Sequence, residues 1–328
     1  MITVALDWTP NTNHSGFYVA LADGLYAEKN LNVKLKSADE SGVAGKTPAR
    51  QVADGEANFA ITPSESAISF ATTDPTKPRL QAVAALVQGS TSAICTLADS
   101  GISRPAQLAG KRYASYVGRF EDAIVSRMVS NDGGDGSAVK FHPLDFHGYI
   151  DEATMGAGSV VASYLEKGAS DATWIFCHWE GVLAERAGKK LNNFALEEFG
   201  IPYGYSPVLL AHPDQLTGDA AEATRAFLAA TAEGYRRAAA DPAAAAAALC
   251  KCGHPSLSDA AFVEASSRAI APKYLDGADG AWGRMTHARW EAFVDFMSTS
   301  GILIDREGQP IARESVDAAK LFTNDFLP

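Results

Sequence analysis

The strongest constraint in this sequence is the alternation, in its first third, of short β-branched runs with segments of helical periodicity. This alternation favours a mostly parallel sheet covered by helices. Gly55 follows one helical stretch, and Pro63-Ser64 can open the next with the serine as cap. Strands are predicted at residues 2–6, 31–35, 57–61 and 80–87, and helices at residues 16–29, 47–54 and 64–71.

A second α/β series follows, and then an alanine-rich helical tail. The second series has strand patterns at residues 92–97, 112–114, 139–142, 171–176 and 191–194, and helical patterns at 121–131, 159–167 and 179–188. In the tail, helices are predicted at residues 220–240, 243–250, 258–269 and 285–300.

Such a tail rarely forms its own sheet, so we expect it to pack onto the first series. The fold class is therefore α/β, with residues 1–90 and 208–328 in lobe 1 and residues 91–207 in lobe 2. A cleft between two lobes is a favoured place for a ligand.

Composition excludes several function classes. The chain has 28 Lys and Arg against 39 Asp and Glu, and its net charge of −11 argues against a nucleic-acid binder. No run approaches the ~20 apolar residues of a membrane span, so we expect a protein that is not membrane-embedded. We also expect a monomer. The first residues lack a signal-peptide pattern. We expect an extracytoplasmic protein if a leader was removed, and a cytoplasmic one if Met1 is the natural start.

Two local motifs are rejected as sites. Residues 42–47, GVAGKT, resemble a phosphate-binding P-loop, but that motif needs a glycine where this chain has Glu40, so we expect a polar loop before the helix. Cys250, Cys252 and His254 lack the second ligand pair of a zinc site. No Gly-x-Ser-x-Gly or His-Glu-x-x-His motif occurs. We therefore predict no catalytic residues, no metal and no cofactor.

The junction between the first strand and the first helix is the most informative segment. Trp8, Asn11 and His14 gather after the strand, where ligands of open α/β sheets bind. Tyr18 lies one helical turn beyond His14 and can share its face, although packing in the core explains Tyr18 equally well. We predict that all four side chains contact a ligand.

Similar residues follow other predicted strands. Aromatic rings can stack on a flat, nitrogen-rich ring, and a carboxylate can accept from its exocyclic amine. Glu65 and Glu180 could instead be charges in the first turn of a helix. The predicted ligand contacts of this group are Ser64, Glu65, Trp179, Glu180, Tyr203 and Tyr205.

A third candidate segment precedes the helix that begins near residue 121. Ser115, Tyr116 and Arg119, with backbone amides at a helix start, could form a cradle for an anion. Arg119 could equally be a solvated surface charge. Tyr116 and Arg119 are therefore candidate binding residues.

The opening LDWTPNTNHSGFYVA, residues 6–20, resembles the start of the NMT1/THI5-like, or SsuA/THI5-like, family. The resemblance continues through residues 47–50, 63–66, 171–174, 179–181 and 200–207. It implies a type II periplasmic-binding-protein fold. It also implies either an importer component that captures formylaminopyrimidine, or a fungal enzyme that makes the thiamine pyrimidine from pyridoxal phosphate and its own histidine, with iron.

The enzyme branch needs a lysine, a histidine and a cysteine cluster that are absent from the matching positions of this chain. The matching positions hold Thr62 and Ser66, and no cysteine lies near residues 201–207. The loop around residues 116–120 resembles the phosphate loop of the enzyme, so noncovalent binding of a phosphorylated pyrimidine or pyridoxal phosphate near Arg119 stays open.

We therefore expect a protein that is not an enzyme and that binds an aminopyrimidine such as formylaminopyrimidine or hydroxymethylpyrimidine. Its partners would be this ligand and an ABC permease. Trp8 with Tyr203 or Tyr205 would stack on the ring, and Glu65 or Glu180 would accept from its amine. The alternatives are a divergent pyrimidine synthase, a hydrolase that uses His14 or His178, and a binder of sulfonate or another small anion.

Overall fold

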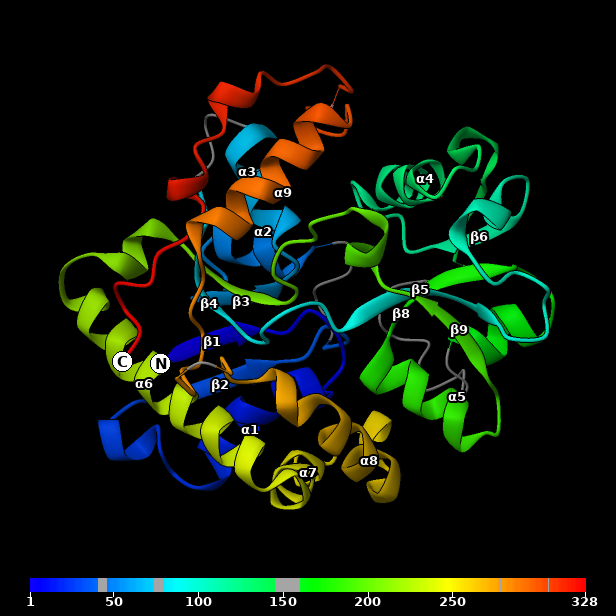
Figure 1. Ribbon diagram of the computed structural model, residues 1–328. Helices are drawn as coiled ribbons and strands as arrows, with labels where there is room; N and C mark the ends of the chain where they lie inside the picture. The colour runs from blue at the N-terminus through cyan, green and yellow to red at the C-terminus, as the bar shows by residue number, and fades with distance from the viewer. Residues whose placement is uncertain (41–45, 74–78, 145–159, 278, 306) are drawn as a thin grey trace. The chain divides into compact units, whose positions relative to one another are not determined.

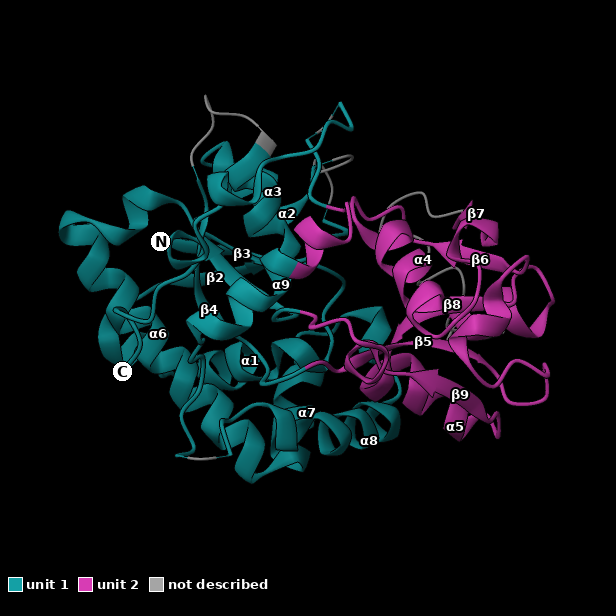
Figure 2. Ribbon diagram, turned by 45° about the horizontal axis from the view of Figure 1, so that its top comes forward, with its two compact units in different colours: residues 1–89, 204–295, 303–328 teal, residues 90–203, 296–302 magenta. Residues whose placement is uncertain are grey.

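The computed structural model describes residues 1–40, 46–73, 79–144, 160–277, 279–305 and 307–328 (Figure 1). The chain forms two compact units, coloured separately in Figure 2. Unit 1 comprises Met1–Gly89, Gly204–Asp295 and Leu303–Pro328, and unit 2 comprises Ser90–Tyr203 and Phe296–Ile302. The alanine-rich tail thus belongs mostly to unit 1.

Unit 1 is built on a five-stranded mixed sheet. Its order is β2 (Val33–Lys36), β1 (Ile2–Ala5), β3 (Phe59–Thr62), β10 (Val208–Ala211) and β4 (Gln81–Ala85). β1 pairs in parallel with β2 and β3, whereas β10 is antiparallel to both β3 and β4. The carboxyl ends of β1 and β3 therefore lie at the same edge as the amino end of β10.

Helices cover both faces of this sheet. In Figure 1, α2 (Pro48–Ala53) and α3 (Glu65–Thr73) lie on one side, and α1 (Ser15–Ala22) and α6 (Gly218–Ala240) on the other. The remaining helices that begin in unit 1 are α7 (Pro242–Cys250), α8 (Ala260–Ile270) and α9 (His287–Thr299).

One predicted helix in unit 1 is divided in the structure. The helix expected over residues 16–29 ends at Ala22 because Gly24 has φ 75°, and a separate 3-10 turn covers Ala27–Lys29. Before α2, Thr47 caps the backbone amide of Arg50, which fits the predicted polar loop. Residues 42–45 of the rejected P-loop pattern lie outside the described residues.

The core of unit 1 centres on Phe227 of α6. Its ring stacks on Phe59 of β3 with centroids 4.7 Å apart, and also on Tyr26 at 5.6 Å. Phe17 of α1 stacks on the same ring at 6.2 Å. One residue of the tail thus joins the central strand to the first helix.

Helices α1 and α6 approach each other at two glycines. A Cβ on Gly16 would overlap the ring of Tyr235, and a Cβ on Gly234 would overlap the backbone carbonyl oxygen of Gly16. A ring can shift, but a backbone carbonyl within a helix cannot, so Gly234 is the stricter requirement.

Gly234→Ala should therefore destabilise the protein although alanine is the better helix former. The overlap should lower the free energy of unfolding by at least about 2 kcal/mol, outweighing the roughly 1 kcal/mol gained in helix propensity. Urea denaturation measures the change. Glu233→Ala, which removes only surface ion pairs with Arg236 and Arg237, serves as the control. Equal stabilities of Gly234→Ala and the wild type would contradict the close packing.

Unit 2 repeats the strand arrangement of unit 1. Its sheet has the order β7 (Lys140–Pro143), β6 (Arg112–Ser115), β8 (Ala172–Phe176), β5 (Ser92–Leu97) and β9 (Leu191–Phe194). β6 pairs in parallel with β7 and β8, and β5 is antiparallel to β8 and β9. The amino end of β5 therefore lies beside the carboxyl end of β8.

The helices of unit 2 differ partly from prediction. α4 (Glu121–Asn131) has the predicted bounds. Within the segment predicted at 159–167, a π-helical segment covers Val161–Glu166, and Ser159 lies outside the described residues. In place of a helix over residues 179–188, a π-helical turn, Cys177–Gly181, leads into α5 (Val182–Arg186). The connection between β8 and this π-helical turn is stabilised by Glu180, as described below.

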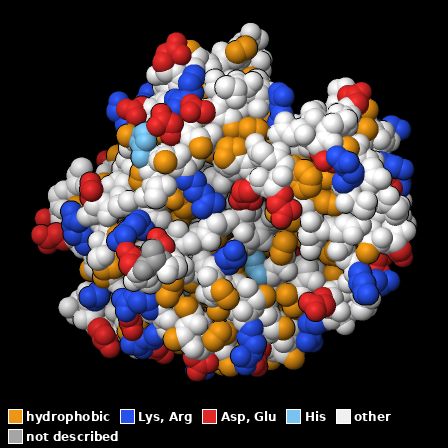
Figure 3. Space-filling model, in the orientation of Figure 1, with side chains coloured by type: hydrophobic (Ala, Val, Ile, Leu, Met, Phe, Trp, Pro, Cys, Tyr) orange, Lys and Arg blue, Asp and Glu red, His pale blue; other side chains and the backbone are white. Residues whose placement is uncertain are grey.

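Charged side chains are dispersed on the face of the molecule that Figure 3 shows. On the face shown in Figure 3, acidic and basic groups are interspersed, and neither sign forms a continuous patch. Among the described residues, no helix has the length and apolar character needed to cross a bilayer.

Candidate functional site

The junction between β1 and α1 is organised by His14. Its Nδ1 atom accepts a hydrogen bond from the backbone amide of Asn11 at 3.2 Å, and its Nε2 atom lies 2.8 Å from Oδ1 of Asp7. Because Nδ1 is an acceptor, the ring proton resides on Nε2 and is donated to Asp7. His14 is fully buried, so it positions the Asp7 carboxylate, which is partly exposed at the end of β1.

Asp7 was not among the predicted site residues. The sequence places it directly after a strand and seven residues before His14, but that spacing alone does not reveal a hydrogen bond. Asn11 also forms hydrogen bonds within the junction, since its side chain accepts from the amide of Asn13 and donates to the carbonyl of Thr9. Asn11 and His14 therefore shape the junction from within.

The helical tail holds the carbonyl groups of this junction. The hydroxyl of Tyr235 donates to the carbonyl of Asn13 at 2.6 Å, and that of Tyr274 donates to Thr12 at 2.7 Å. Ser256 donates to the carbonyl of Pro10 at 3.0 Å. Three side chains distant in sequence thus fix the loop that carries Trp8.

Trp8 and Tyr18 are each half-buried. Burial raises the pKa of Tyr18 well above its usual value, with smaller contributions from Cys252, Glu40 and Asp39. Tyr18 and His14 are one helical turn apart, yet their surroundings differ, because His14 forms a hydrogen bond with Asp7 while Tyr18 lies near Cys252. The ligand contacts predicted for Trp8 and Tyr18 stay predictions.

Ser64 lies at the carboxyl end of β3 and is fully buried. Its amide donates to the carbonyl of Tyr205 at 2.9 Å, which ties this end to the segment before β10. Its hydroxyl has no hydrogen-bond partner in the described part of the chain. A Cβ on Gly204 would overlap that hydroxyl, so the backbone of Gly204 lies directly against one side of it. Glu65, the first residue of α3, is half-buried beside it.

Tyr205 is engaged within unit 1. Its hydroxyl accepts from the amide of Thr286 at 3.0 Å, and the guanidinium of Arg289 lies 4.5 Å from the ring centroid. Only 2% of Tyr205 is exposed. Of the two tyrosines proposed to stack on a ligand, Tyr205 therefore has a clear packing role before α9.

In unit 2, Glu180 lies at the carboxyl end of β8. Its Oε2 atom accepts from the amide of Phe176 at 2.8 Å, and 9% of the residue is exposed. Burial, and to a smaller extent the Glu180 charge, raise the pKa of Cys177 to about 11. That thiol is therefore protonated at neutral pH, which argues against a nucleophilic role.

Thr91 and Ser92 lie beside this end of β8. The amide of Cys177 donates to the carbonyl of Thr91 at 2.8 Å, and Ser92 pairs with Phe176. Both side chains are buried, and neither hydroxyl has a hydrogen-bond partner among the residues described. Neither residue was predicted, because a hydroxyl at the start of a strand is unremarkable until its burial is known.

Aromatic side chains accompany these groups in unit 2. The rings of Trp174 and Tyr203 lie 5.4 Å apart at 59°, and Tyr203 and Trp179 are both buried. Trp174 is half-buried on β8 and was not among the predicted site residues. Whether Tyr203 and Trp179 contact a ligand stays a prediction.

The loop between β6 and α4 binds the carboxyl group of Glu121, a residue of the protein itself. Oε1 of Glu121 accepts from the Tyr113 hydroxyl at 3.0 Å and from the Tyr116 amide at 3.2 Å, and Oε2 accepts from the Gly118 amide at 3.2 Å. Arg119 is exposed, with its guanidinium 4.8 Å from the ring centroid of Phe120. Two backbone amides of the predicted segment therefore converge on a side chain of the protein itself, and anion binding by Tyr116 and Arg119 stays a prediction.

This loop is strained at Val117. Its φ of 59° is unusual for a β-branched residue, and 67% of the residue is exposed. The amide of Val117 donates to the Ser115 hydroxyl, which in turn donates to Asp122 at 2.6 Å. These bonds and those of Glu121 hold the strained conformation in place.

Burial raises the pKa of Glu121 to about 7, against the opposing effect of its three donors. Because the folded protein binds this proton more tightly than the unfolded chain, the stabilisation is complete below the unfolded pKa near 4.5 and is lost as pH rises through 7. Between pH 4.5 and 8, the wild type should lose on the order of 3 kcal/mol relative to Glu121→Gln. Chemical denaturation of both proteins across this range measures the difference, and a difference that does not vary with pH would contradict the assignment.

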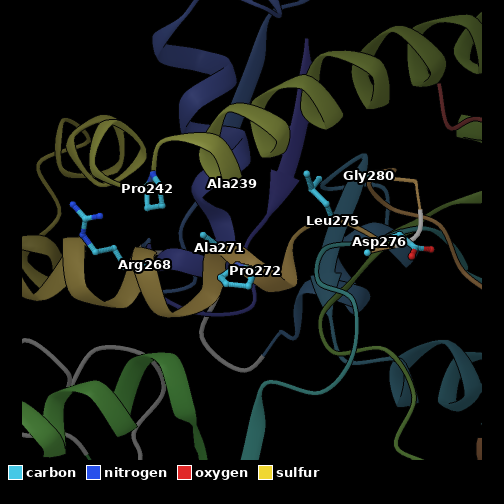
Figure 4. Close-up of a pocket in the computed structure, with 9 residues that line it drawn as sticks. Ala239, Pro242, Arg268, Ala271, Pro272, Leu275, Asp276 and Gly280 are labelled. Carbon is cyan, nitrogen blue, oxygen red and sulfur yellow. The ribbon is translucent and has the colours of Figure 1, made fainter.

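A separate surface pocket lies in unit 1 and has a volume of about 590 Å³. Figure 4 shows it between the ends of α6 and α8, with Arg268 and Asp276 at opposite ends. None of the predicted site residues lines it. Within the described ranges, no group of three or more His, Cys, Asp or Glu side chains is arranged to hold a metal ion.

Comparison with solved structures identifies the fold. The nitrate-binding protein NrtA from Synechocystis PCC 6803 matches with a TM-score of 0.69 at 11% identity, covering 99% of this chain and 87% of that one. SsuA from Xanthomonas axonopodis pv. citri, an alkanesulfonate-binding protein bound to MOPS, matches with a TM-score of 0.65 at 14% identity, covering 98% and 97%. The protein therefore has the fold of the periplasmic solute-binding class, as predicted.

Sequence comparison then identifies the family. The NMT1/THI5 like family matches residues 11–245, and the chain belongs to this family, which confirms the resemblance noted above. The formylaminopyrimidine-binding protein of Halalkalibacterium halodurans is 23% identical over 318 residues, covering 95% of this chain and 88% of the relative. The chain is thus a member of the NMT1/THI5 like family with the fold of the periplasmic solute-binding class.

Proposed function

We propose that this protein binds an aminopyrimidine precursor of thiamine, such as formylaminopyrimidine, and delivers it to an ABC permease. The observation that carries the proposal is the set of buried hydroxyl groups that lack a hydrogen-bond partner among the described residues, at the strand ends of both units. These are Ser64 in unit 1 and Thr91 and Ser92 in unit 2.

Buried polar groups without partners are uncommon in folded proteins, because each costs about 1–3 kcal/mol. Their position at strand ends within each unit, where α/β proteins bind ligands, fits groups that a ligand completes. A hydroxyl can donate to a ring nitrogen or accept from an amine, and an aminopyrimidine offers both.

The neighbouring carboxylates suit the amines of such a ligand. Asp7 is positioned by His14 in unit 1, and Glu180 is positioned by the Phe176 amide in unit 2. A carboxylate has acceptor sites for several hydrogen bonds, so both groups suit an amine. Each unit also offers aromatic surface that suits such a ring, from Trp8 in unit 1 and from Tyr203 and Trp179 in unit 2.

The family relative supports this ligand class, since the Halalkalibacterium protein is named for binding formylaminopyrimidine. Two observations favour binding over catalysis. The positions matched to the lysine and histidine of the pyrimidine synthase hold Thr62 and Ser66, and the thiol of Cys177 is protonated at neutral pH.

Calorimetric titration with formylaminopyrimidine and hydroxymethylpyrimidine tests the proposal. An alkanesulfonate is titrated in parallel as the alternative class of ligand. We expect binding of a pyrimidine, and at least tenfold weaker binding by Glu180→Gln, on the order of 1.4 kcal/mol for the lost charge-assisted bond. If the wild type binds neither pyrimidine, or binds the sulfonate more tightly, the proposed function is rejected.

A second test uses the hydroxyl of Ser64. Because this group has no partner among the described residues, Ser64→Ala should leave the stability of the free protein within about 0.5 kcal/mol of wild type. It should weaken pyrimidine binding about three- to tenfold, because a hydrogen bond to the ligand is lost.

Ser267→Ala is the matched control, since Ser267 is equally buried and lacks a partner among the described residues, but lies on α8. It should leave both the stability and the affinity unchanged. Equal affinities of Ser64→Ala and the wild type would remove Ser64 from the site.

A further inference from the structure

The loop that joins β6 to α4 has the features of an anion-binding site. Two backbone amides, those of Tyr116 and Gly118, and the hydroxyl of Tyr113 converge on one point at the start of an eleven-residue helix. Such convergent donors, together with the positive end of the helix dipole, bind phosphate or sulfonate groups in many proteins.

Here the converging donors are occupied by the side chain of Glu121. The three donors lie 3.0 to 3.2 Å from its two carboxylate oxygens. The fit is close, because a Cβ on Gly118 would lie 3.4 Å from Oε2 of Glu121. The carboxylate thus takes the position in which an external anion would accept from these donors.

The occupied cradle lies close to solvent. Glu121 itself is buried, whereas Val117, Gly118 and Arg119 are exposed. An anion approaching these exposed residues would meet Glu121 and Asp122, which follow each other in the first turn of α4. Asp122 is held by the Ser115 hydroxyl.

We propose that Glu121 is a specificity-determining residue that excludes phosphate and sulfonate groups from unit 2 by occupying the anion cradle itself. A small external anion would have to displace a buried carboxylate that already accepts three hydrogen bonds. This inference rests on the proposed function. It narrows the ligand to an aminopyrimidine that carries no phosphate or sulfonate group.

The test is anion binding by wild type and Glu121→Ala, with inorganic phosphate and methanesulfonate as probes. Thermal shift and calorimetry are run at pH 8 and constant ionic strength, where the Glu121 carboxyl is mostly ionised. Glu121→Ala frees the three donors, so we expect it to bind both anions at least about tenfold more tightly than the wild type does.

Asp122→Asn is the matched control, because it removes the same charge one residue later and leaves Glu121 in the cradle. It should gain no anion binding, so an equal gain in both variants would mean that net charge alone is responsible and would overturn the proposal. Wild-type binding as tight as that of Glu121→Ala would also overturn it.

Folding of the variant is followed by circular dichroism. If Glu121→Ala folds only with phosphate or methanesulfonate present, that rescue supports the proposal. If Glu121→Ala stays unfolded with either anion, the anion affinity of Glu121→Gln is measured instead. A higher affinity than that of the wild type supports the proposal, and an unchanged affinity overturns it. Pyrimidine titration of the same wild-type sample distinguishes the two hypotheses. An absence of pyrimidine binding would reject the proposed function and would leave the anion result unchanged.

Discussion

The hydrogen bonds from the helical tail to the β1–α1 junction are the constraint on which the candidate site in unit 1 depends. Tyr235, Tyr274 and Ser256 each donate to a carbonyl of a segment that would otherwise leave several backbone groups unsatisfied. The same tail places Phe227 against the central strand. The position of Asp7 and Trp8 therefore depends on residues more than two hundred positions away.

The two units use one arrangement of strands for a similar purpose. In each, the amino end of an antiparallel strand lies beside the carboxyl end of a parallel strand, as β10 does beside β3 and β5 beside β8. Backbone bonds from Ser64 to Tyr205 and from Cys177 to Thr91 close the two pairs. The result in both units is a rigid strand end with buried hydroxyl groups, which suits recognition of a small polar molecule.

The fold was predictable because it depends on local periodicity. The alternation of strands and helices indicated two α/β series, and the absence of strand patterns after residue 219 indicated that the tail packs elsewhere. The site was less predictable, because its chemistry depends on distances between side chains. Glu121 shows this well, since the sequence suggested a cradle from Ser115 to Arg119, but only the structure reveals that the next acidic residue occupies it. The roles of His14, Thr91 and Ser92 were hidden for the same reason.

The position of β10 in the sheet affects the order in which the chain can fold during synthesis. β10 separates β3 from β4, yet it is made after all of the contiguous segment Ser90–Tyr203. Until residues 208–211 leave the ribosome, β3 and β4 each have an open edge at which another chain could pair. The segment from residue 90 to residue 203 contains all five strands of its own sheet. The second unit can therefore complete its sheet on the ribosome before the first unit, although the first unit begins at the amino terminus.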